Sequence, residues 1–253
     1  MKLGHPKHVI QRSFLKAKSS FYKPTLKADP TSHSFIDDHS FCSVSQYSDS
    51  LVESTKFLGI HFDRRLTFDE HILYIINKLK KFIPTFYRLR DLMPQKTLRL
   101  IFEQLCVPMM RYCLLAYGNG SKLLLNKLQR KQKILIKIMH RKEGQSLKLD
   151  FYKNEEFMNI ETMYEYELLI LAYKIKYQSD ILPVPFKEYV MCSRRHNENF
   201  QIPLCRTSLE QKTSTFTIPF KWNMLPVKIK TAKSIREFKR NLKLHLIEKM
   251  ISF

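Results

Sequence analysis

The chain has 253 residues, and its 44 lysines and arginines against 23 acidic residues give a formal net charge of +21. An apolar content of 44% is too high for an intrinsically disordered protein, and five glycines are too few for a dinucleotide-binding loop or a turn-rich β-sandwich. Such a surplus of positive charge favours an anionic partner, either nucleic-acid phosphate or an acidic membrane surface. A solvated basic surface without a ligand is the third interpretation.

The cysteines and the apolar segments indicate the cellular compartment of the chain. Five widely spaced cysteines, an odd number, are not the framework of a secreted disulfide protein. Cys192, His196 and Cys205 lie close together in sequence but lack paired spacing and a fourth ligand, so no metal site is predicted. No segment approaches the ~20 apolar residues that span a bilayer, and none follows the N-terminus. We therefore expect an intracellular chain, cytoplasmic or nuclear, without a membrane partner.

The first 66 residues show little helical periodicity. Residues 1–34 are basic and contain three prolines, which predicts an arm or the truncated edge of a larger domain. Residues 35–66 contain short alternating and β-branched stretches that predict a β-hairpin. Its strands are expected at 41–45 and 56–62, with a polar connection at 46–50.

Residues 67–180 are predicted to form a helical domain. Thr67 and Glu70 have the spacing of a capping box, in which the hydroxyl and the carboxylate satisfy first-turn amides, so a helix should follow. Its apolar face comprises Ile72, Ile75, Ile76, Leu79, Phe82 and Ile83. Pro84 should kink or end this helix, because proline has no amide hydrogen. A further helix is expected to begin near Gln95.

A strongly basic helix is predicted at 121–142, after interruptions at Pro108, Gly118 and Gly120. Its core-facing residues are Leu124, Leu128, Leu135 and Ile138 or Met139. Its cationic stripe is Arg130, Lys133, Lys137 and Arg141. No acidic residue in the segment neutralises this stripe. Phosphate contact is therefore the favoured interpretation, and an amphipathic helix on a membrane surface is the second.

The C-terminal part combines an irregular stretch with two helices. Residues 158–178 have a helical period, whereas four prolines make 180–220 an irregular crossing. Ser234 and Glu237 form a second capping box, which opens a C-terminal helix within an extension at 181–253. The inner residues of that helix are Ile235, Phe238, Leu242 and Leu246, and its outer basic row is Arg236, Arg240 and Lys243. The predicted fold class is mainly α, a multi-helix bundle with a small N-terminal β-hairpin and an irregular proline-containing segment before a C-terminal helix.

Short motifs also occur in a fixed order between about residues 35 and 250. The first is KFLGIHFDRRLTF from Lys56 to Phe68, followed by Glu70-His71-Ile72. Later matches are Pro94, Leu98, Pro108, Tyr112, Tyr117-Gly118 and Leu128-Gln129-Arg130-Lys131-Gln132. The last are Trp222-Asn223-Met224-Leu225-Pro226, Ser234, Phe238-Lys239 and Leu242-Lys243. This series resembles the segment after the polymerase palm in reverse transcriptases of non-LTR (LINE-type) retrotransposons, with jockey-like elements as the most similar subgroup.

The resemblance implies a thumb-like bundle that holds a template–primer duplex. Phe57, Leu58 and Gly59 would correspond to the hairpin that grips the primer end, where Gly59 permits close approach of a sugar-phosphate chain. The nucleic-acid-binding residues expected from the resemblance and from the basic stripe are Lys56, Gly59, Arg64, Arg65, Arg130, Lys133, Lys137 and Arg141. From the residue types alone, Phe57, Leu58 and Ile60 are expected to be mostly core, and Trp222 a packing anchor.

The catalytic motifs of that family are not evident. Its polymerases hold Mg²⁺ with clustered carboxylates on palm strands. Phe35-Ile36-Asp37-Asp38 has the aromatic-x-Asp-Asp form, but only 34 residues precede it, so an exposed turn is expected there. We expect no catalytic residue, no metal ligand and no cofactor in this chain, and no catalytic role for His61 or His71. If the chain is truncated, a missing upstream polymerase segment is expected as a partner besides an RNA or DNA duplex.

The expected function is therefore that of a fragment of an RNA-directed DNA polymerase, inactive alone, which binds RNA or DNA duplexes non-specifically through phosphates. The alternative is a non-enzymatic helical protein, or the relic of a decayed element, without a ligand.

Overall fold

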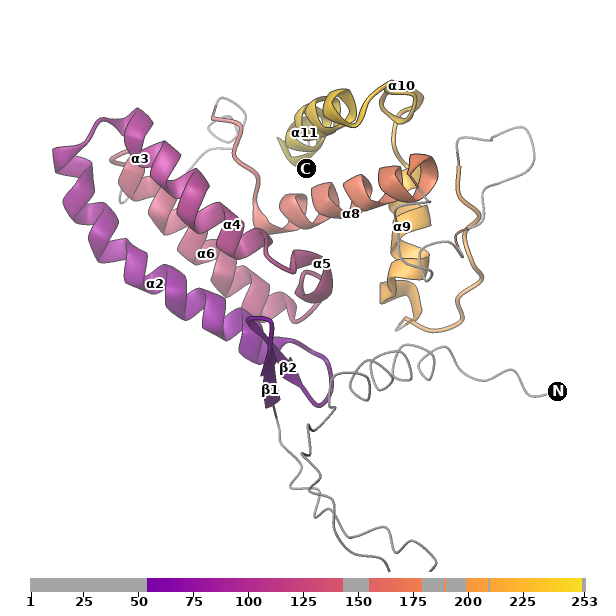
Figure 1. Ribbon diagram of the computed structural model, residues 1–253, viewed down its shortest axis with the longest axis horizontal. Coiled ribbons are helices and arrows are strands. Elements are labelled where there is room, and N and C mark those ends of the chain that lie inside the picture. Colours follow the sequence, from indigo (N-terminus) through magenta and orange to yellow (C-terminus); the bar gives the residue numbers. More distant parts are fainter. Residues whose placement is uncertain (1–53, 143–154, 179–188, 190–198, 209, 252–253) are drawn as a thin grey trace, which may run out of the picture. The chain divides into compact units, whose positions relative to one another are not determined.

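The computed structural model describes residues 54–142, 155–178, 189, 199–208 and 210–251 (Figure 1). The predicted fold class is confirmed, because this part of the chain is mainly helical and begins with a two-stranded antiparallel hairpin. The expected arm and the expected strand at 41–45 lie outside the described residues.

The hairpin consists of β1 (Ser54–Phe57) and β2 (Ile60–Asp63), with Phe57 opposite Ile60. Leu58 and Gly59 connect the strands with φ angles of 48° and 82°. Two positive φ angles are typical of the tight hairpin turn whose twist matches that of the strands. The prediction of one strand over 56–62 is therefore wrong, because the chain reverses in the middle of it.

Helix α2 (Asp69–Leu92) follows and contains Pro84, which was expected to kink or end it; the helix does not end there. The helix continues for two more turns, since Leu79 and Phe86 on either side of the exposed Pro84 are fully buried in the core. The prediction of a capping box formed by Thr67 and Glu70 is also wrong. Phe68 occupies the N-cap position with φ 60° and has no side-chain cap, and the Thr67 hydroxyl donates to Asp63 instead.

The next segment stays helical across Pro108 by changing its pitch. It comprises α3 (Gln95–Ile101), the π-helical turn η1 (Phe102–Cys106) and α4 (Val107–Arg111). A π-turn contains one extra residue, which accommodates a proline that cannot donate the next helical hydrogen bond. The expected interruption at Pro108 is thus a change of helix type. Helix α5 (Leu114–Tyr117) then ends at the predicted glycines.

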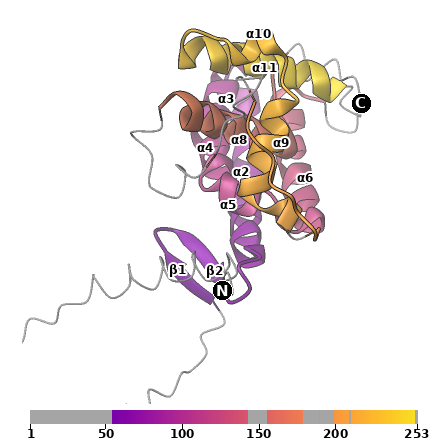
Figure 2. The same cartoon turned by 90° about the vertical axis from the view of Figure 1, so that its right-hand side faces the viewer.

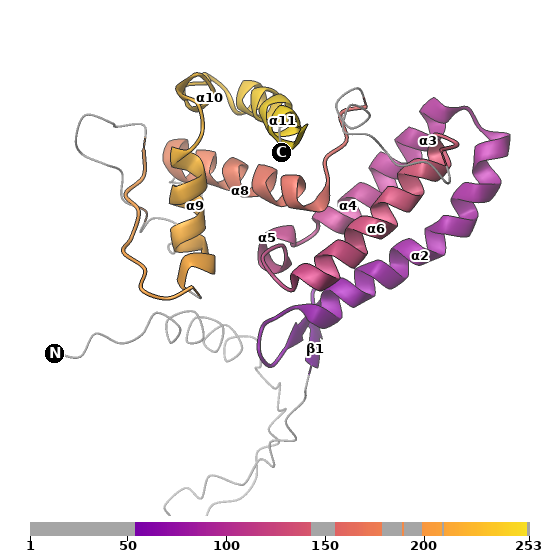
Figure 3. The same cartoon turned by 180° about the vertical axis from the view of Figure 1, so that it is seen from behind.

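Helix α6 (Lys122–Met139) packs along α2, as Figures 1 and 3 show from opposite sides. Its predicted core residues Leu128, Leu135 and Ile138 are fully buried. Together with α2 and the α3–α4 segment it encloses the first hydrophobic cluster. A Cβ atom on Gly120, just before α6, would lie 3.1 Å from the Thr67 carbonyl, whereas Arg141, just after it, bonds to the Arg90 carbonyl. The two helices therefore run parallel.

The remaining helices are α8 (Ile160–Tyr177), α9 (Ser214–Asn223), α10 (Val227–Lys230) and α11 (Ile235–Ile251), with a 3₁₀ turn at Glu210–Lys212. They enclose a second hydrophobic cluster, in which α8 contacts both α9 and α11 (Figures 1 and 2). The second capping box is confirmed in its main bond, because the Glu237 amide donates to Ser234 Oγ at 3.2 Å. The Glu237 carboxylate accepts from the amide of Lys233.

Trp222 is a packing anchor, as predicted. Its fully buried ring lies 5.8 Å from the rings of both Phe200 and Phe238. Next to it, the Asn223 side chain exchanges two hydrogen bonds of 2.9 Å with the backbone of Phe200. The buried Lys230 ammonium donates to the Asn223 carbonyl, also at 2.9 Å. Trp222 and Asn223 thus connect α9 to the chain around Phe200, and the Trp222 ring also connects it to α11.

Replacing Trp222 with Ala should lower the free energy of unfolding by about 3–5 kcal/mol, because it leaves a large cavity between two aromatic rings. Denaturant unfolding of the full chain measures this. Met224→Ala, in the same segment but exposed, should change the value by less than about 0.5 kcal/mol. Equal losses in the two variants would contradict the anchor role.

Candidate nucleic-acid interface

Arg64 and Arg65 lie in a loop that the Asp63 carboxylate holds together. One carboxylate oxygen accepts the Thr67 amide at 3.1 Å and the other accepts the Phe68 amide at 3.0 Å. Both arginines are exposed, between the end of β2 and the start of α2. Because the loop is fixed at both sides of the arginines, it presents them to solvent from a defined position.

The same bonds alter the acidity of Asp63. Partial burial alone would raise the pKa of its carboxyl, but the hydrogen bonds from Thr67 and Phe68 to the ionised form outweigh it and lower the pKa. Asp63 is therefore ionised at neutral pH, and its carboxylate is bound by amides of the loop.

Lys56 on β1 and Lys78 on α2 converge on one aromatic ring. Their ammonium groups lie 5.4 Å and 4.5 Å from the centre of the Tyr74 ring. The hydrogen bond from Lys78 is the main cause of a lowered pKa of the Tyr74 hydroxyl, and the charge of Lys56 adds to it. The hairpin therefore adds a second cation to a position that α2 already makes positive.

The hairpin tip is exposed, which corrects the expectation that Phe57 and Leu58 are core residues. Their exposed fractions are 59% and 73%, and the Leu58 carbonyl accepts a hydrogen bond of 2.6 Å from the Tyr112 hydroxyl. Gly59 adopts φ 82°, a conformation that would strain any side chain. The tip thus combines an exposed apolar surface with a glycine turn that the Tyr112 side chain approaches from one side.

The predicted cationic stripe is present on α6 over three of its four residues. Arg130 and Lys133 are exposed and Lys137 is half-buried, all on the side away from the core. None of the three forms an ion pair with a residue in the described ranges. Lys122 and Lys127 extend the exposed basic face toward the start of the helix. This face has no compensating carboxylate within α6.

Arg141 departs from the stripe. Helix α6 ends at Met139, and Arg141 has a φ of 52°, so it does not continue the helical row. Its guanidinium donates to the Arg90 carbonyl at 3.0 Å and lies 3.6 Å from the Asp91 carboxylate. The prediction of a fourth unpaired cation in line with the others is therefore wrong. A carboxylate from α2 reaches it, which no spacing within 121–142 could reveal.

The eight predicted site residues form two groups rather than one. Because α2 and α6 run parallel, Lys56, Gly59, Arg64 and Arg65 lie at the end of the bundle where both helices start. The α6 row leads away from that end, and Arg141 lies at the opposite one.

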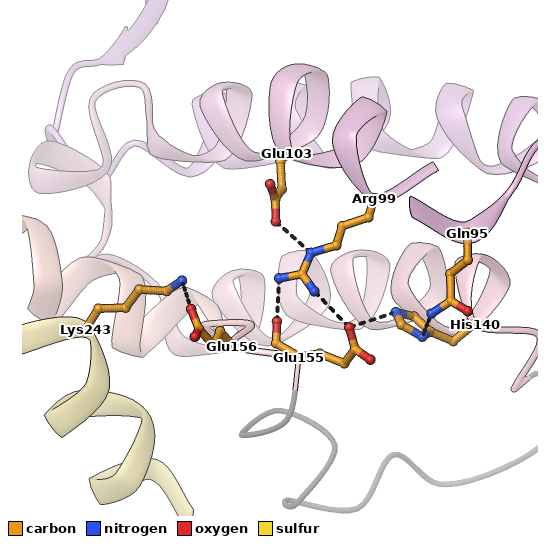
Figure 4. Close-up of polar contacts among 7 residues, drawn as sticks. All are labelled: Gln95, Arg99, Glu103, His140, Glu155, Glu156 and Lys243. Carbon is orange, nitrogen blue, oxygen red and sulfur yellow. Dashed lines mark hydrogen bonds and ion pairs between the residues drawn. The ribbon is translucent and has the colours of Figure 1, made fainter. Parts of the chain in front are cut away.

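A polar network at that opposite end was not predicted (Figure 4). The Arg99 guanidinium pairs with the carboxylates of Glu103 and Glu155, and the Gln95 amide nitrogen lies 2.6 Å from Nδ1 of His140. The Arg99–Glu155 and Gln95–His140 pairs join residues 56 and 45 positions apart. No local pattern signals such contacts.

His61 and His71 lie in an aromatic cluster with Tyr74, and the buried His71 also contacts the ring of Tyr117. Burial, with the nearby His61 and Lys78, lowers the pKa of His71, so its ring is neutral at pH 7. In the described ranges no three His, Cys, Asp or Glu side chains cluster as metal ligands would. Asp37, Asp38, Cys192 and His196 lie outside those ranges, and Cys205 is a half-buried free thiol.

No protein family, curated protein or solved structure matches the chain. Among the described helices, none is both long and apolar enough to cross a bilayer.

Asp63→Ala should lower the free energy of unfolding at pH 7 by about 1 kcal/mol, the typical effect of removing a side chain that accepts backbone amides. The folded-state pKa lies below the unfolded one, so this contribution is complete above the ordinary pKa of about 3.9 and disappears as the pH falls through the lower folded-state value. Denaturant unfolding of the unchanged chain and of the Asp63→Ala variant, recorded from neutral pH into this acidic range, measures the difference in free energy. Glu70→Ala tests the discarded capping box and should cost less; a larger cost would restore that box.

Proposed function

We propose that this chain binds nucleic-acid duplexes non-specifically through their phosphates, as a thumb-like part of a retrotransposon reverse transcriptase that does not catalyse polymerisation alone. The observation that carries the proposal is the basic face of α6, on which Arg130, Lys133 and Lys137 have no carboxylate partner in the described residues. A row of unpaired cations repels itself in water and is stabilised by phosphates, whose binding releases condensed counterions.

The spacing of the row supports a phosphate backbone as the partner. At 1.5 Å per residue, Arg130 and Lys137 are separated by about 10 Å along the axis of α6. One strand of B-DNA rises about 3.4 Å per phosphate, so this length corresponds to about three phosphate steps along the duplex axis. The side chains are long enough to adjust to either a DNA or an A-form duplex.

The hairpin end supplies a second set of contacts in this proposal. Lys56, Arg64 and Arg65 are exposed cations around an exposed tip, and the left-handed Gly59 leaves room for a sugar-phosphate chain. The resemblance to non-LTR reverse transcriptases assigns Phe57, Leu58 and Gly59 to a grip on the primer end, and Lys56, Arg64 and Arg65 flank that grip. The exposed Phe57 and Leu58 add an apolar surface that could contact a base or a sugar.

Replacing Arg130, Lys133 and Lys137 together with Gln should weaken duplex binding for every sequence alike, because phosphates carry no sequence information. The plot of log K against log[salt] should become shallower by about 0.9 for each lost phosphate contact, about three units in total. Fluorescence anisotropy with labelled duplexes between low and physiological salt measures both effects.

The matched control replaces Lys80, Lys96 and Lys228, three exposed lysines on three other helices, with Gln. If both triple variants lose affinity equally, net charge alone is at work and α6 is not a site. Preference for anionic vesicles over duplex would instead favour a membrane-surface helix. Absence of binding to either would favour the helical protein without a ligand.

The purified chain, given Mg²⁺ or Mn²⁺, dNTPs and a primed RNA template, should extend no primer above background. Polymerisation requires paired carboxylates on palm strands, and only Asp37 and Asp38 have a suitable sequence pattern. Extension that is abolished by Asp37→Ala and Asp38→Ala would contradict this prediction.

A further inference from the structure

Helix α9 carries a line of apolar side chains that the second cluster does not cover. Phe216 and Phe220 lie one turn apart in the helix, and Met224 at its C-cap continues the line. The exposed fractions of Phe220 and Met224 are 41% and 63%, and Phe216 is half-buried. Ile218 and Trp222, on the other side of α9, belong to the second cluster. Neither the α6 row nor the hairpin accounts for this exposed line.

The two phenylalanine rings of the line hold each other in place. Their centres are 5.5 Å apart and their planes differ by 14°, which is an offset-stacked pair. The Phe220 ring therefore keeps its orientation without a ligand, which reduces the entropy lost when one binds. An exposed ring of this kind is a surface on which a nucleobase can stack, and every base has a face suited to it.

The surroundings of the line are positively charged. The chain has four lysines and one acidic residue between residues 210 and 230. Lys221 pairs with Glu165 at 3.3 Å, whereas Lys212 and Lys228 are exposed and form no ion pair with a residue in the described ranges. A second copy of this surface would bring like charges together, so the line fits a partner that combines negative charge with flat apolar groups.

The spacing of the line favours an unpaired nucleic-acid strand over a duplex. Four residues of an α-helix rise about 6 Å, whereas successive bases of one strand of B-DNA rise about 3.4 Å. Inside a duplex the face of each base is also covered by its neighbours. Bases can therefore reach Phe220 and Met224 along this line only where the strand is unpaired and extended.

The line begins close to the end of the bundle that carries the proposed duplex contacts. The Asn119 side-chain amide donates to the Lys212 carbonyl at 2.7 Å, and α6 starts at Lys122, three residues after Asn119. Lys212 in turn precedes Phe216 by four residues. A strand that leaves a duplex at the start of α6 would therefore meet Lys212 and then the two rings.

We propose that Phe216, Phe220 and Met224 bind an unpaired nucleic-acid strand through stacking of its bases, with Lys212 contacting its phosphates. The first amides of α9 add to this contact, because they have no acceptor within the helix and no side chain caps them in the described part of the chain. The direction from which the strand arrives rests on the proposed function. The ligand is thus a duplex with an unpaired extension, accepted without regard to its sequence.

The test compares the affinity of the full chain for one duplex without a tail, with a thymidine tail and with an abasic tail of equal length. The abasic tail keeps the phosphates and lacks the bases, so the difference between the two tails isolates stacking. The thymidine tail should bind roughly fivefold to a hundredfold more tightly than the abasic tail, the effect of stacking a base on an aromatic side chain. Phe220→Ala should abolish this difference, and Phe220→Tyr, which keeps an aromatic face, should retain it.

The matched control is Leu244→Ala, which removes an exposed apolar side chain from α11 and should leave the difference between the tails unchanged. A second readout places 2-aminopurine in the tail, because its fluorescence responds to stacking. Binding of the unchanged chain should alter this fluorescence, and binding of the Phe220→Ala variant should not. Thermal unfolding of each variant verifies that it folds.

The outcomes separate this inference from the proposed function. Equal binding of the two tails, or a difference that survives Phe220→Ala, would overturn the inference, while the effect of the α6 triple variant would still support duplex binding. A difference that requires Phe220, in a chain whose binding of the blunt duplex is unchanged in the α6 triple variant, would support the strand site and contradict the α6 site. Self-association in sedimentation that Phe220→Ala abolishes would show that a second copy covers the line, and would overturn the inference.

Discussion

Helix α8 is apolar around most of its circumference, and the rest of the described structure is arranged to cover it. Its first turns place Ile160 and Met163 in the cluster enclosed by α2, α3 and α6, whereas its later turns place Leu169 and Tyr173 among α9 and α11. A helix of this kind is stable only when it is surrounded, because each exposed face would return apolar surface to water. The bundle and the C-terminal helices therefore depend on each other through α8.

The same helix explains why the basic face of α6 is not neutralised. Acidic side chains gather in and just before α8: Glu155, Glu156, Glu165 and Glu167. Their cationic partners come from other elements: Arg99, Lys243, Lys249 and Arg111. The chain has nearly twice as many basic as acidic residues. Carboxylates that form ion pairs around α8 therefore leave fewer to pair with the cations of α6. Partly exposed pairs of this kind each contribute little to stability, about 0–1 kcal/mol, so their main effect is on where the positive charge stays uncompensated.

Local sequence patterns predicted the helices and their buried faces well, because a helix repeats every 3.6 residues and its core side can be read from one segment. Contacts between distant segments were not predictable in this way. The predicted Thr67–Glu70 capping box is not formed; the carboxylate of Asp63, at the end of the preceding strand, accepts the amides of Thr67 and Phe68 instead. Arg141 meets a carboxylate of α2, and Arg99 meets Glu155 across 56 residues, so neither pair leaves a pattern in the local sequence. The binding role of the α6 face stays a prediction of sequence and charge together.

The double burial of α8 also has a consequence for the order in which the chain can fold during translation. The first cluster can assemble once α8 has left the ribosome, but among the described residues the cover of the face that carries Leu169 and Tyr173 is not complete until Trp222 and Phe238 have been made. Roughly 60 residues separate the end of α8 from Phe238, which corresponds to about 3–12 s at usual rates of synthesis. For that interval a nascent helix displays a wide apolar face, the kind of surface that chaperones bind and that leads to aggregation when they are scarce.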